Sequence, residues 1–130
     1  MFVLDSNTII LAFQGKGRVA ERLAAVPPSR LAIPAIALFE VELGVLKSRN
    51  SALRRKHLSQ LADACRILAF DEQCGRLAAK LRVDLEDSGC VIGPLDTLIA
   101  ATALAHAATL VTRNTREFQR VPGLKIEDWF

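Results

Sequence analysis

The chain has 130 residues, 51% of them apolar, and a formal net charge of +3. This length and composition predict one folded domain with its own core and exclude an intrinsically disordered chain. No apolar run reaches the roughly 20 residues of a membrane span, and the N-terminus lacks a signal-peptide pattern, so we expect a soluble, cytoplasmic protein with no membrane association. The cysteines (Cys65, Cys74 and Cys90) form no C-x-x-C or Cys/His ligand pattern, which favours buried free thiols over a zinc site or a disulfide framework.

The first half of the chain predicts two short strands and four helices. Residues 2–4 and 31–33 are apolar enough for buried strands, and Asp5-Ser-Asn-Thr suits the turn and N-cap that open a helix. Pro27-Pro28 ends the second helix. The expected helices cover residues 9–13, residues 19–25, a stretch that begins after Pro34, and a stretch marked by Leu53, Leu58 and Leu61.

The helix after Pro34 carries an apolar stripe with an acid on either side of it. Glu40 and Glu42 each lie about 80° from the centre of the stripe at 100° per residue, so periodicity does not choose between them. Gly44 stands one turn beyond Glu40 and leaves that side chain uncovered, while two solvated glutamates are the alternative. The stripe consists of Ile36, Phe39, Leu43 and Leu46, spaced 3, 4 and 3 apart.

The second half continues the alternation of strands and helices. Residues 65–70 predict a strand, Asp71 suits the N-cap of a long helix, and Ser88-Gly89 closes that helix. Its apolar face consists of Cys74, Leu77, Ala78, Leu81 and Leu85. A helix from Pro94, a buried strand at 109–112, a loop at 113–116 and an edge strand at 124–126 complete the chain.

The helix that begins at Pro94 is apolar almost all the way round, which predicts a buried helix. Asp96 and His106 are its only ionisable residues. A buried carboxylate needs a cation, a hydrogen-bond donor or a proton, so Asp96 is a candidate functional residue. The alternative is an acid placed in the first helical turn, where the helix dipole favours it.

Alternating strands and crossover helices predict an α/β fold, with a single domain over residues 1–130 and a mostly parallel central sheet that has helices on both faces. Ligands of such sheets bind outside the carboxyl ends of the strands. Asp5 follows the first strand, and Asn114 follows the strand at 109–112. Glu40 and Asp96 lie near the starts of helices that face the same edge. We therefore expect several carboxylates to gather there.

Clustered carboxylates repel one another unless a cation lies among them. Oxygen ligands without a Cys or His pattern suit Mg²⁺, with Mn²⁺ as a substitute, better than zinc. Such an ion supports in-line hydrolysis of a phosphodiester. A haloacid-dehalogenase-type phosphatase needs a second Asp where Asn7 stands, and a receiver domain needs an acidic pair and a late Lys that are absent. The chain also lacks the Gly-rich loops of nucleotide-binding folds.

Five segments of the chain together form a recognisable pattern: Phe2-Val-Leu-Asp-Ser-Asn-Thr8, Phe39-Glu-Val-Glu-Leu-Gly44, Ile92-Gly-Pro-Leu-Asp-Thr-Leu-Ile-Ala100, Leu110-Val-Thr-Arg-Asn-Thr-Arg-Glu-Phe118 and Val121-Pro-Gly-Leu-Lys-Ile-Glu-Asp-Trp129. In these segments and their order, the chain resembles PIN-domain ribonucleases of the VapC toxin type over essentially its whole length. The resemblance implies the toxin of a type II toxin–antitoxin system. It also implies a Mg²⁺-dependent endoribonuclease that acts on RNA, such as a tRNA or rRNA loop, forms a homodimer and is neutralised by a small cognate antitoxin.

The resemblance also assigns roles to individual residues. The first, second and third family acids fall on Asp5, Glu40 and Asp96, which are the implied catalytic residues and metal ligands. This assignment selects Glu40 from the two acids beside the apolar stripe. Asn7 and Thr112 are implied as supporting polar groups.

Many relatives carry a fourth acid after the last-but-one strand. This chain has Asn114 there, with Glu117 three residues further on, so both residues are candidates for that position and Glu117 is a candidate catalytic residue. Arg113 and Arg116 lie beside them and are candidate contacts for RNA phosphates. A solvated surface is the usual alternative for such a group of basic residues.

Two other functions are compatible with the sequence. One is a PIN fold kept as a dimerisation or antitoxin-binding module with little catalysis, although the three retained acids argue against it. The other is a metal-dependent nuclease that acts on DNA, which competition between matched RNA and DNA would test.

Overall fold

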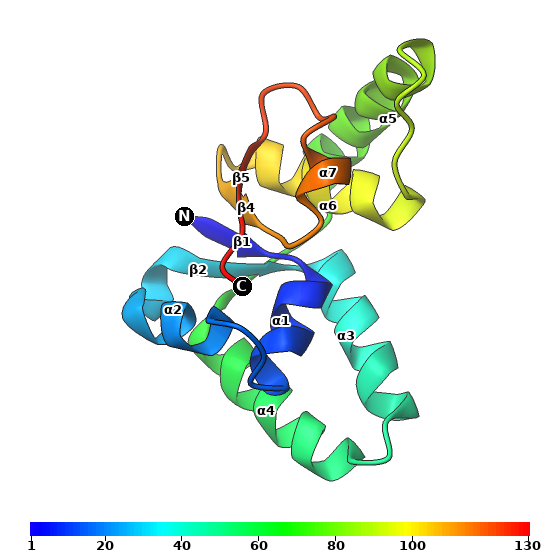
Figure 1. Cartoon of the computed structure of the whole chain (residues 1–130). Coiled ribbons are helices and arrows are strands. Elements are labelled where there is room, and N and C mark those ends of the chain that lie inside the picture. Colours follow the sequence, from blue (N-terminus) through cyan, green and yellow to red (C-terminus); the bar gives the residue numbers. More distant parts are fainter.

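A five-stranded parallel sheet organises the computed structural model, which describes residues 1–130 (Figure 1). The strand order is β3-β2-β1-β4-β5, and all neighbouring pairs are parallel. The α/β fold and the parallel sheet expected from the sequence are confirmed. The strands are β1 (Phe2–Leu4), β2 (Leu31–Pro34), β3 (Arg66–Leu68), β4 (Thr109–Val111) and β5 (Lys125–Glu127).

Helices form the connections between the strands. In Figure 1, α1 to α4 lie together below β1 and β2, whereas α5, α6 and α7 gather with β4 and β5 above them. α5 and α6 pack against each other, and α3 contacts α1, α4 and α6. The α-helices are α1 (Ser6–Phe13), α2 (Val19–Ala25), α3 (Ala35–Lys47), α4 (Ser51–Ala64), α5 (Glu72–Asp87), α6 (Pro94–Ala105) and α7 (Thr115–Phe118).

The central strands and α6 form the middle of the core. Val3 and Leu4 of β1 and Leu110 and Val111 of β4 are fully buried, as is Ile99 of α6. β1 and β4 are covered on both faces, so their residues read as a continuous apolar run instead of an alternating one. The all-round apolar sequence of α6 has the same cause, and its predicted burial is confirmed.

Most element boundaries agree with the sequence prediction, and the differences arise from local capping. α1 begins at Ser6, before the predicted residue 9, because the Asp5 carboxylate accepts a hydrogen bond from the Thr8 backbone N–H at 2.8 Å and caps the helix. The predicted loop at 113–116 is partly wrong. Residues 115–118 form α7, whose Phe118 is buried in the core and holds that helical turn in place.

Three of the four residues of the apolar stripe predicted for α3 face away from the core, and only Ile36 is half-buried against it. Phe39 is 54% exposed, Leu43 41% and Leu46 72%, whereas the core contacts come from Ala37, Val41 and Val45. Periodicity reports where apolar residues lie on the helix but does not tell which of two apolar faces is buried. The buried face is the one that carries Ala37, Val41 and Val45, which are spaced four residues apart, and α3 contacts β2 and α6.

No helix combines the length and the apolar composition needed to cross a membrane. The cysteines are free, as the sequence predicts, but only Cys74 is buried, and Cys65 and Cys90 are half-buried.

Candidate active site

The strand order reverses between β1 and β4, and a pair of buried polar residues marks this point. The chain first runs from β1 through β2 to β3 and then returns to β4 on the other side of β1. Asp5 directly follows β1 and Thr112 directly follows β4. The Thr112 hydroxyl donates a hydrogen bond of 2.5 Å to Asp5 Oδ2. In parallel α/β sheets, a crevice at such a reversal is the usual ligand site.

Asp5 is held rigidly by donors on both of its oxygens. Oδ1 accepts from the Thr8 backbone N–H at 2.8 Å, and Oδ2 accepts from Thr112. The side chain is only 4% exposed. Burial raises the pKa of Asp5, the hydrogen bonds from Thr112 and Thr8 oppose that rise, and the negative charge of Asp128 adds to it.

Glu40 and Glu42 have different partners in the structure. The Ser6 hydroxyl donates to Glu40 Oε1 at 3.1 Å, which ties Glu40 to the start of α1 beside Asp5. Arg55 Nη1 of α4 binds Glu42 at 2.6 Å. Glu42 is therefore neutralised by an arginine, while Glu40 faces the edge of the sheet where Asp5 lies. Sequence reasoning did not identify Ser6, because one serine in a helix-capping turn carries no separate signal.

Asp96 and Glu117 meet above the backbone of Gly93. A side chain at Gly93 would place its Cβ 3.1 Å from Asp96 Oδ2 and 3.5 Å from Glu117 Oε1. The Gly93 N–H donates to Glu117 Oε1 at 2.6 Å, and the Asn114 amide donates to Oε2 at 2.8 Å. The residue before Pro94 thus helps to bring the two acids together. Glycine fits there because any side chain would crowd both carboxylates.

The two acids of this pair differ in pKa. The pKa of Asp96 is raised to about 7, mainly by burial and then by the hydrogen bond and the negative charge of Glu117, with smaller contributions from the charges of Glu40 and Asp5. The hydrogen bond from the Gly93 N–H lowers the pKa of Glu117, assisted by Asn114. Asp96 is therefore the carboxyl that retains a proton, and Glu117 is the one that carries charge.

None of these acids is neutralised by an ion pair within the chain. Asp5, Glu40, Asp96 and Glu117 are absent from all of its ion pairs. No group of three or more His, Cys, Asp or Glu side chains is already arranged to enclose a metal ion. The donor set is nevertheless oxygen only and lacks a cation, which fits a hard ion that keeps several water ligands better than a tightly enclosed one.

The other residues expected at the site occupy distinct places. Asn114 supports Glu117, and its backbone N–H donates to Thr112 Oγ1 at 3.0 Å. Asn7 is exposed, forms no hydrogen bond with the acids and lines an open cavity together with Arg113 and Asn114. Arg116 is exposed on α7 and belongs to none of the ion pairs of the chain.

Asp128 is a charged neighbour of the site that sequence reasoning missed. Its carboxylate lies 3.7 Å from Arg113 Nη1, and its charge acts on the pKa of Asp5. Phe130 packs its ring against the same guanidinium, with Arg113 Cζ 3.5 Å from the ring centroid. Asp128 directly follows the edge strand β5, and no local sequence pattern predicts that this position lies near the end of β1.

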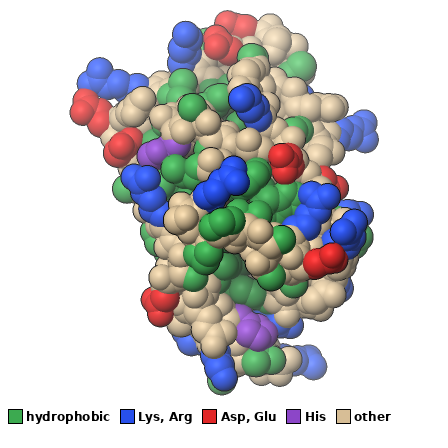
Figure 2. Space-filling view, turned by 90° about the vertical axis from the view of Figure 1, so that its left-hand side faces the viewer, with side chains coloured by type: hydrophobic (Ala, Val, Ile, Leu, Met, Phe, Trp, Pro, Cys, Tyr) green, Lys and Arg blue, Asp and Glu red, His purple; other side chains and the backbone are tan.

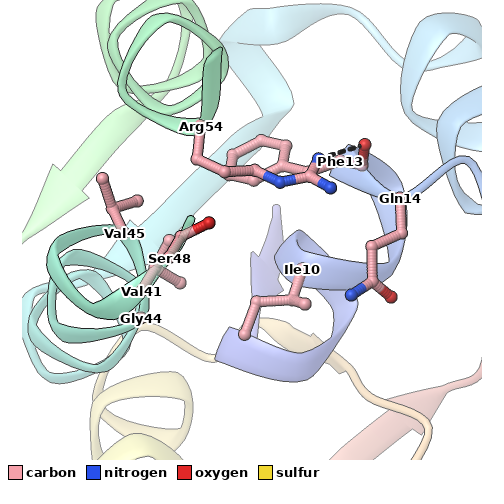
Figure 3. Close-up of a pocket in the computed structure, with 8 residues that line it drawn as sticks. All are labelled: Ile10, Phe13, Gln14, Val41, Gly44, Val45, Ser48 and Arg54. Atoms are coloured by element: carbon pink, nitrogen blue, oxygen red, sulfur yellow. Dashed lines mark hydrogen bonds between the residues drawn. The ribbon is translucent and has the colours of Figure 1, made fainter. Parts of the chain in front are cut away.

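A second, smaller cavity lies away from the acids, between α1, α3 and α4 (Figure 3). Its volume is about 140 Å³. Arg54 Nη1 donates to the Phe13 carbonyl at 2.6 Å across one side of it. Apolar side chains and Gly44 of α3 form the opposite side. The lining residues are Ile10, Phe13, Gln14, Val41, Gly44, Val45, Ser48 and Arg54.

Basic side chains are dispersed on the face of the molecule seen in Figure 2. There, Lys and Arg side chains alternate with acidic ones around a central apolar band and do not form one continuous patch. The net charge of +3 is consistent with this mixture. A contact with a polyanion is therefore better sought in the arginines beside the acids than in the overall charge.

Comparison with known proteins identifies the family. The model of the PIN domain family matches residues 2–124. A tRNA(fMet)-specific endonuclease VapC from Salmonella typhimurium is 35% identical over 98% of this chain and 97% of its own length. Ribonuclease VapC2 from Rickettsia felis is 39% identical over 76% of this chain and 74% of its own.

Solved structures show the same relationship. The crystal structure of VapBC2 from Rickettsia felis bound to a promoter DNA fragment contains a chain that matches with a TM-score of 0.91 and 33% identity, covering 99% of this chain and 98% of that one. DNA-bound VapBC from Salmonella typhimurium matches with a TM-score of 0.91 and 32% identity over the same shares. Fold and relatives agree, and the chain belongs to the VapC group of the PIN-domain family, whose ribonucleases depend in general on a divalent metal.

Proposed function

We propose that this chain is a Mg²⁺-dependent endoribonuclease and the toxin of a VapBC-type toxin–antitoxin pair that acts in the cytoplasm. The observation that carries the catalytic proposal is the convergence of Asp5, Glu40, Asp96 and Glu117 at the reversal of strand order, with none of these acids in an ion pair. A structural role alone would not require like charges to be gathered there, because their mutual repulsion destabilises the folded chain.

Asp5, Glu40 and Asp96 would hold the ion, with Glu117 at the edge of the site. Mg²⁺, or Mn²⁺ as a substitute, supplies positive charge for the phosphate and lowers the pKa of a bound water. The chain itself orients the ligands: Thr8 and Thr112 hold the Asp5 oxygens, and Ser6 holds Glu40. Asp96 would hold the ion in its ionised form, so metal binding would be coupled to loss of the proton from this carboxyl.

We propose RNA as the substrate, with Arg113 and Arg116 as phosphate contacts. Arg113 lines a cavity that also contains Asn114, the partner of Glu117, so a phosphate there lies next to the acids. The Salmonella relative is named a tRNA(fMet)-specific endonuclease, which supports a structured RNA with an accessible loop as the substrate class.

A small antitoxin is the proposed protein partner, and the cavity between α1, α3 and α4 is its proposed binding site. The VapBC complexes among the solved relatives support the partnership. The cavity is open beside Gly44, where an added Cβ would meet no atom within 4 Å. A side chain from a partner can therefore enter without displacing the helices.

A second copy of the chain is proposed to cover the exposed stripe of α3. Phe39, Leu43 and Leu46 are large apolar side chains on one face of one helix, and such a patch on a soluble domain marks a protein contact. Pairing of identical helices about a two-fold axis would bury the patch in both copies. Light scattering of the purified chain would measure its oligomeric state.

A cleavage assay tests the catalytic proposal. We expect the chain to cut a single-stranded RNA oligonucleotide with Mg²⁺, to be inactive with EDTA, and to leave a matched DNA intact. Asp5→Asn and Asp96→Asn should each abolish cleavage while circular dichroism shows an unchanged fold. Preferential cleavage of DNA, or full activity in either variant, would contradict the proposal.

A further inference from the structure

The largest cavity next to the acids runs along one face of α1. Asn7, Ile10, Leu11 and Gln14 line it from the helix side, and their spacing of 3, 1 and 3 residues places them on the same helical face. Arg113 and Asn114 line the other side. The cavity volume is about 430 Å³, within the range of sites that bind small molecules.

One end of this cavity lies at the candidate active site and the other end leads away from it. Asn7 follows Asp5 by two residues, and the Asn114 amide donates to Glu117. Gln14 is two turns of α1 further along, about 10 Å from Asn7 at 1.5 Å per residue. A nucleotide bound here would be the one next to the phosphate being cut.

The chemistry of the walls suits a nucleobase. Ile10 and Leu11 offer an apolar surface for the face of a base, while the Asn7 and Gln14 amides are not hydrogen-bonded to other side chains. Amide side chains can donate and accept at once, which is how Asn and Gln read base edges. No acidic residue lines the cavity, so a polyanion is not repelled from its walls.

Arg113 is held in position to bind the accompanying phosphate. Phe130 covers the guanidinium at 3.5 Å, and Asp128 lies 3.7 Å from Nη1. Phe130 itself packs on Gly17, where an added Cβ would lie 2.7 Å from the ring. The remaining N–H groups of Arg113 have no partner within the chain and are free for a phosphate.

We infer that this cavity, lined by Asn7, Ile10, Leu11, Gln14, Arg113 and Asn114, binds the nucleotide that flanks the scissile bond and sets which base is accepted there. The inference rests on the proposed ribonuclease activity and adds a specificity-determining site to it. Gln14 is the residue that distinguishes this site from the metal site, because it lies at the far end, where it also lines the smaller cavity between α1, α3 and α4, and contacts none of the acids.

The test uses a library of single-stranded RNA oligonucleotides in which the positions around the cleavage site are randomised. Sequencing of the cleavage products shows which bases are accepted at each position. We expect the parent chain to prefer one base at one flanking position and Gln14→Ala to reduce that preference about tenfold, the value of one lost base contact. Gln14→Glu, which loses the amide donors but keeps the size, should shift the preference to another base. Gln73→Ala, an exposed glutamine on α5, is the matched control and should reproduce the parent profile.

The possible failures are distinguishable. If the parent chain cuts no RNA, the proposed function is wrong, and the inference that rests on it is wrong as well. If the parent cuts and both Gln14 variants keep its base profile, the ribonuclease stands and the cavity is not a base site. A uniform fall in cleavage at all sequences, or weaker antitoxin binding with an unchanged profile, would equally overturn the inference. Melting curves of the variants confirm that each is folded.

Discussion

The Thr112 hydroxyl donates a hydrogen bond of 2.5 Å to Asp5 Oδ2 across 107 positions of sequence, and both groups are buried. Thr112 Oγ1 also accepts from the Asn114 N–H, so one hydroxyl connects the first acid to the loop that leads to Glu117. The contact exists because β1 and β4 are neighbours in the sheet. It is a direct link between the fold and the orientation of the site.

Thr112→Val should lower both stability and cleavage. The change keeps the shape of the side chain but removes a buried hydrogen bond to a carboxylate, so we expect a loss of about 2 kcal/mol in the free energy of unfolding. The pKa of Asp5 should rise further because the lowering effect of Thr112 is lost. Cleavage should then reach its maximum at a higher pH, which a pH–rate profile would show.

Thr102→Val is the control for that substitution. Thr102 is also buried, but its hydroxyl donates within α6 to the Leu98 carbonyl at 2.8 Å. It forms no hydrogen bond with Asp5. We expect its pH profile to match that of the parent chain. Equal profiles for Thr112→Val and the parent would show that Thr112 has no influence on Asp5.

Asp96→Asn should change how the stability of the metal-free chain depends on pH. The folded pKa of Asp96 is raised from 3.8 to about 7, so its favourable contribution is fully present below pH 3.8 and is lost as the pH rises through about 7. The asparagine side chain of the variant does not ionise, so the variant does not lose stability in this way as the pH rises. We expect equal melting temperatures near pH 4 and a higher one for the variant at pH 8.

The same experiment with Mg²⁺ should reverse the order at pH 8. A ligand that binds the folded state stabilises it. Because Asp96 is ionised at pH 8, Mg²⁺ should stabilise the parent chain at this pH more than it stabilises the variant. Melting curves at both pH values with and without the metal measure this. If Mg²⁺ stabilises the parent chain equally at pH 4 and pH 8, Asp96 is not a ligand of the ion.

Glu117→Gln should lower cleavage chiefly at low Mg²⁺. Both Glu117 oxygens accept hydrogen bonds, from Gly93 and Asn114, and a glutamine can accept through only one of them. The variant also removes a negative charge beside Asp96, so the pKa of Asp96 should fall. A titration of cleavage against Mg²⁺ should show partial recovery at high metal. Asn114→Ala leaves the carboxylate in place and should cost less, while identical titrations for Glu117→Gln and the parent would remove Glu117 from the site.

Arg116→Ala should weaken RNA binding for all sequences alike. Loss of one phosphate contact should reduce the slope of log affinity against log salt by about one. Arg76→Ala is the matched control because Arg76 is exposed on α5 and ion-paired with Glu72. A slope that equals that of the control would mean that Arg116 is only a solvated surface residue.

Gly44→Leu should impair antitoxin binding without preventing the chain from folding. Its side chain would enter the cavity between α1, α3 and α4, and glycine is a poor helix former, so the free chain should be as stable as the parent or more so. Gly44→Ala gains the same helical preference but leaves most of the cavity open, and it should keep antitoxin binding. Calorimetric titration with the cognate antitoxin compares them, and equal affinities would place the antitoxin elsewhere.

The sequence by itself determined the order of strands and helices and several of their ends. Asp5 caps α1 and Asp71 caps α5, as their positions before apolar helical patterns predict. These features are local: a cap or a buried strand depends on residues a few positions apart. The resemblance to PIN domains is also visible in short segments, because each of the acids lies within a run of a few characteristic residues.

Only the tertiary structure decided what those residues contact. It separated Glu40, bonded to Ser6, from Glu42, paired with Arg55, because that choice depends on which side of α3 faces α1 and which faces α4. It exposed Phe39, Leu43 and Leu46 of α3, because both faces of this helix carry apolar residues and only the packing against β2 and α6 selects the buried one. It also placed Asp128 near Asp5, because parallel pairing of β4 with β5 brings distant segments to one edge, and local sequence patterns carry no information on such pairing.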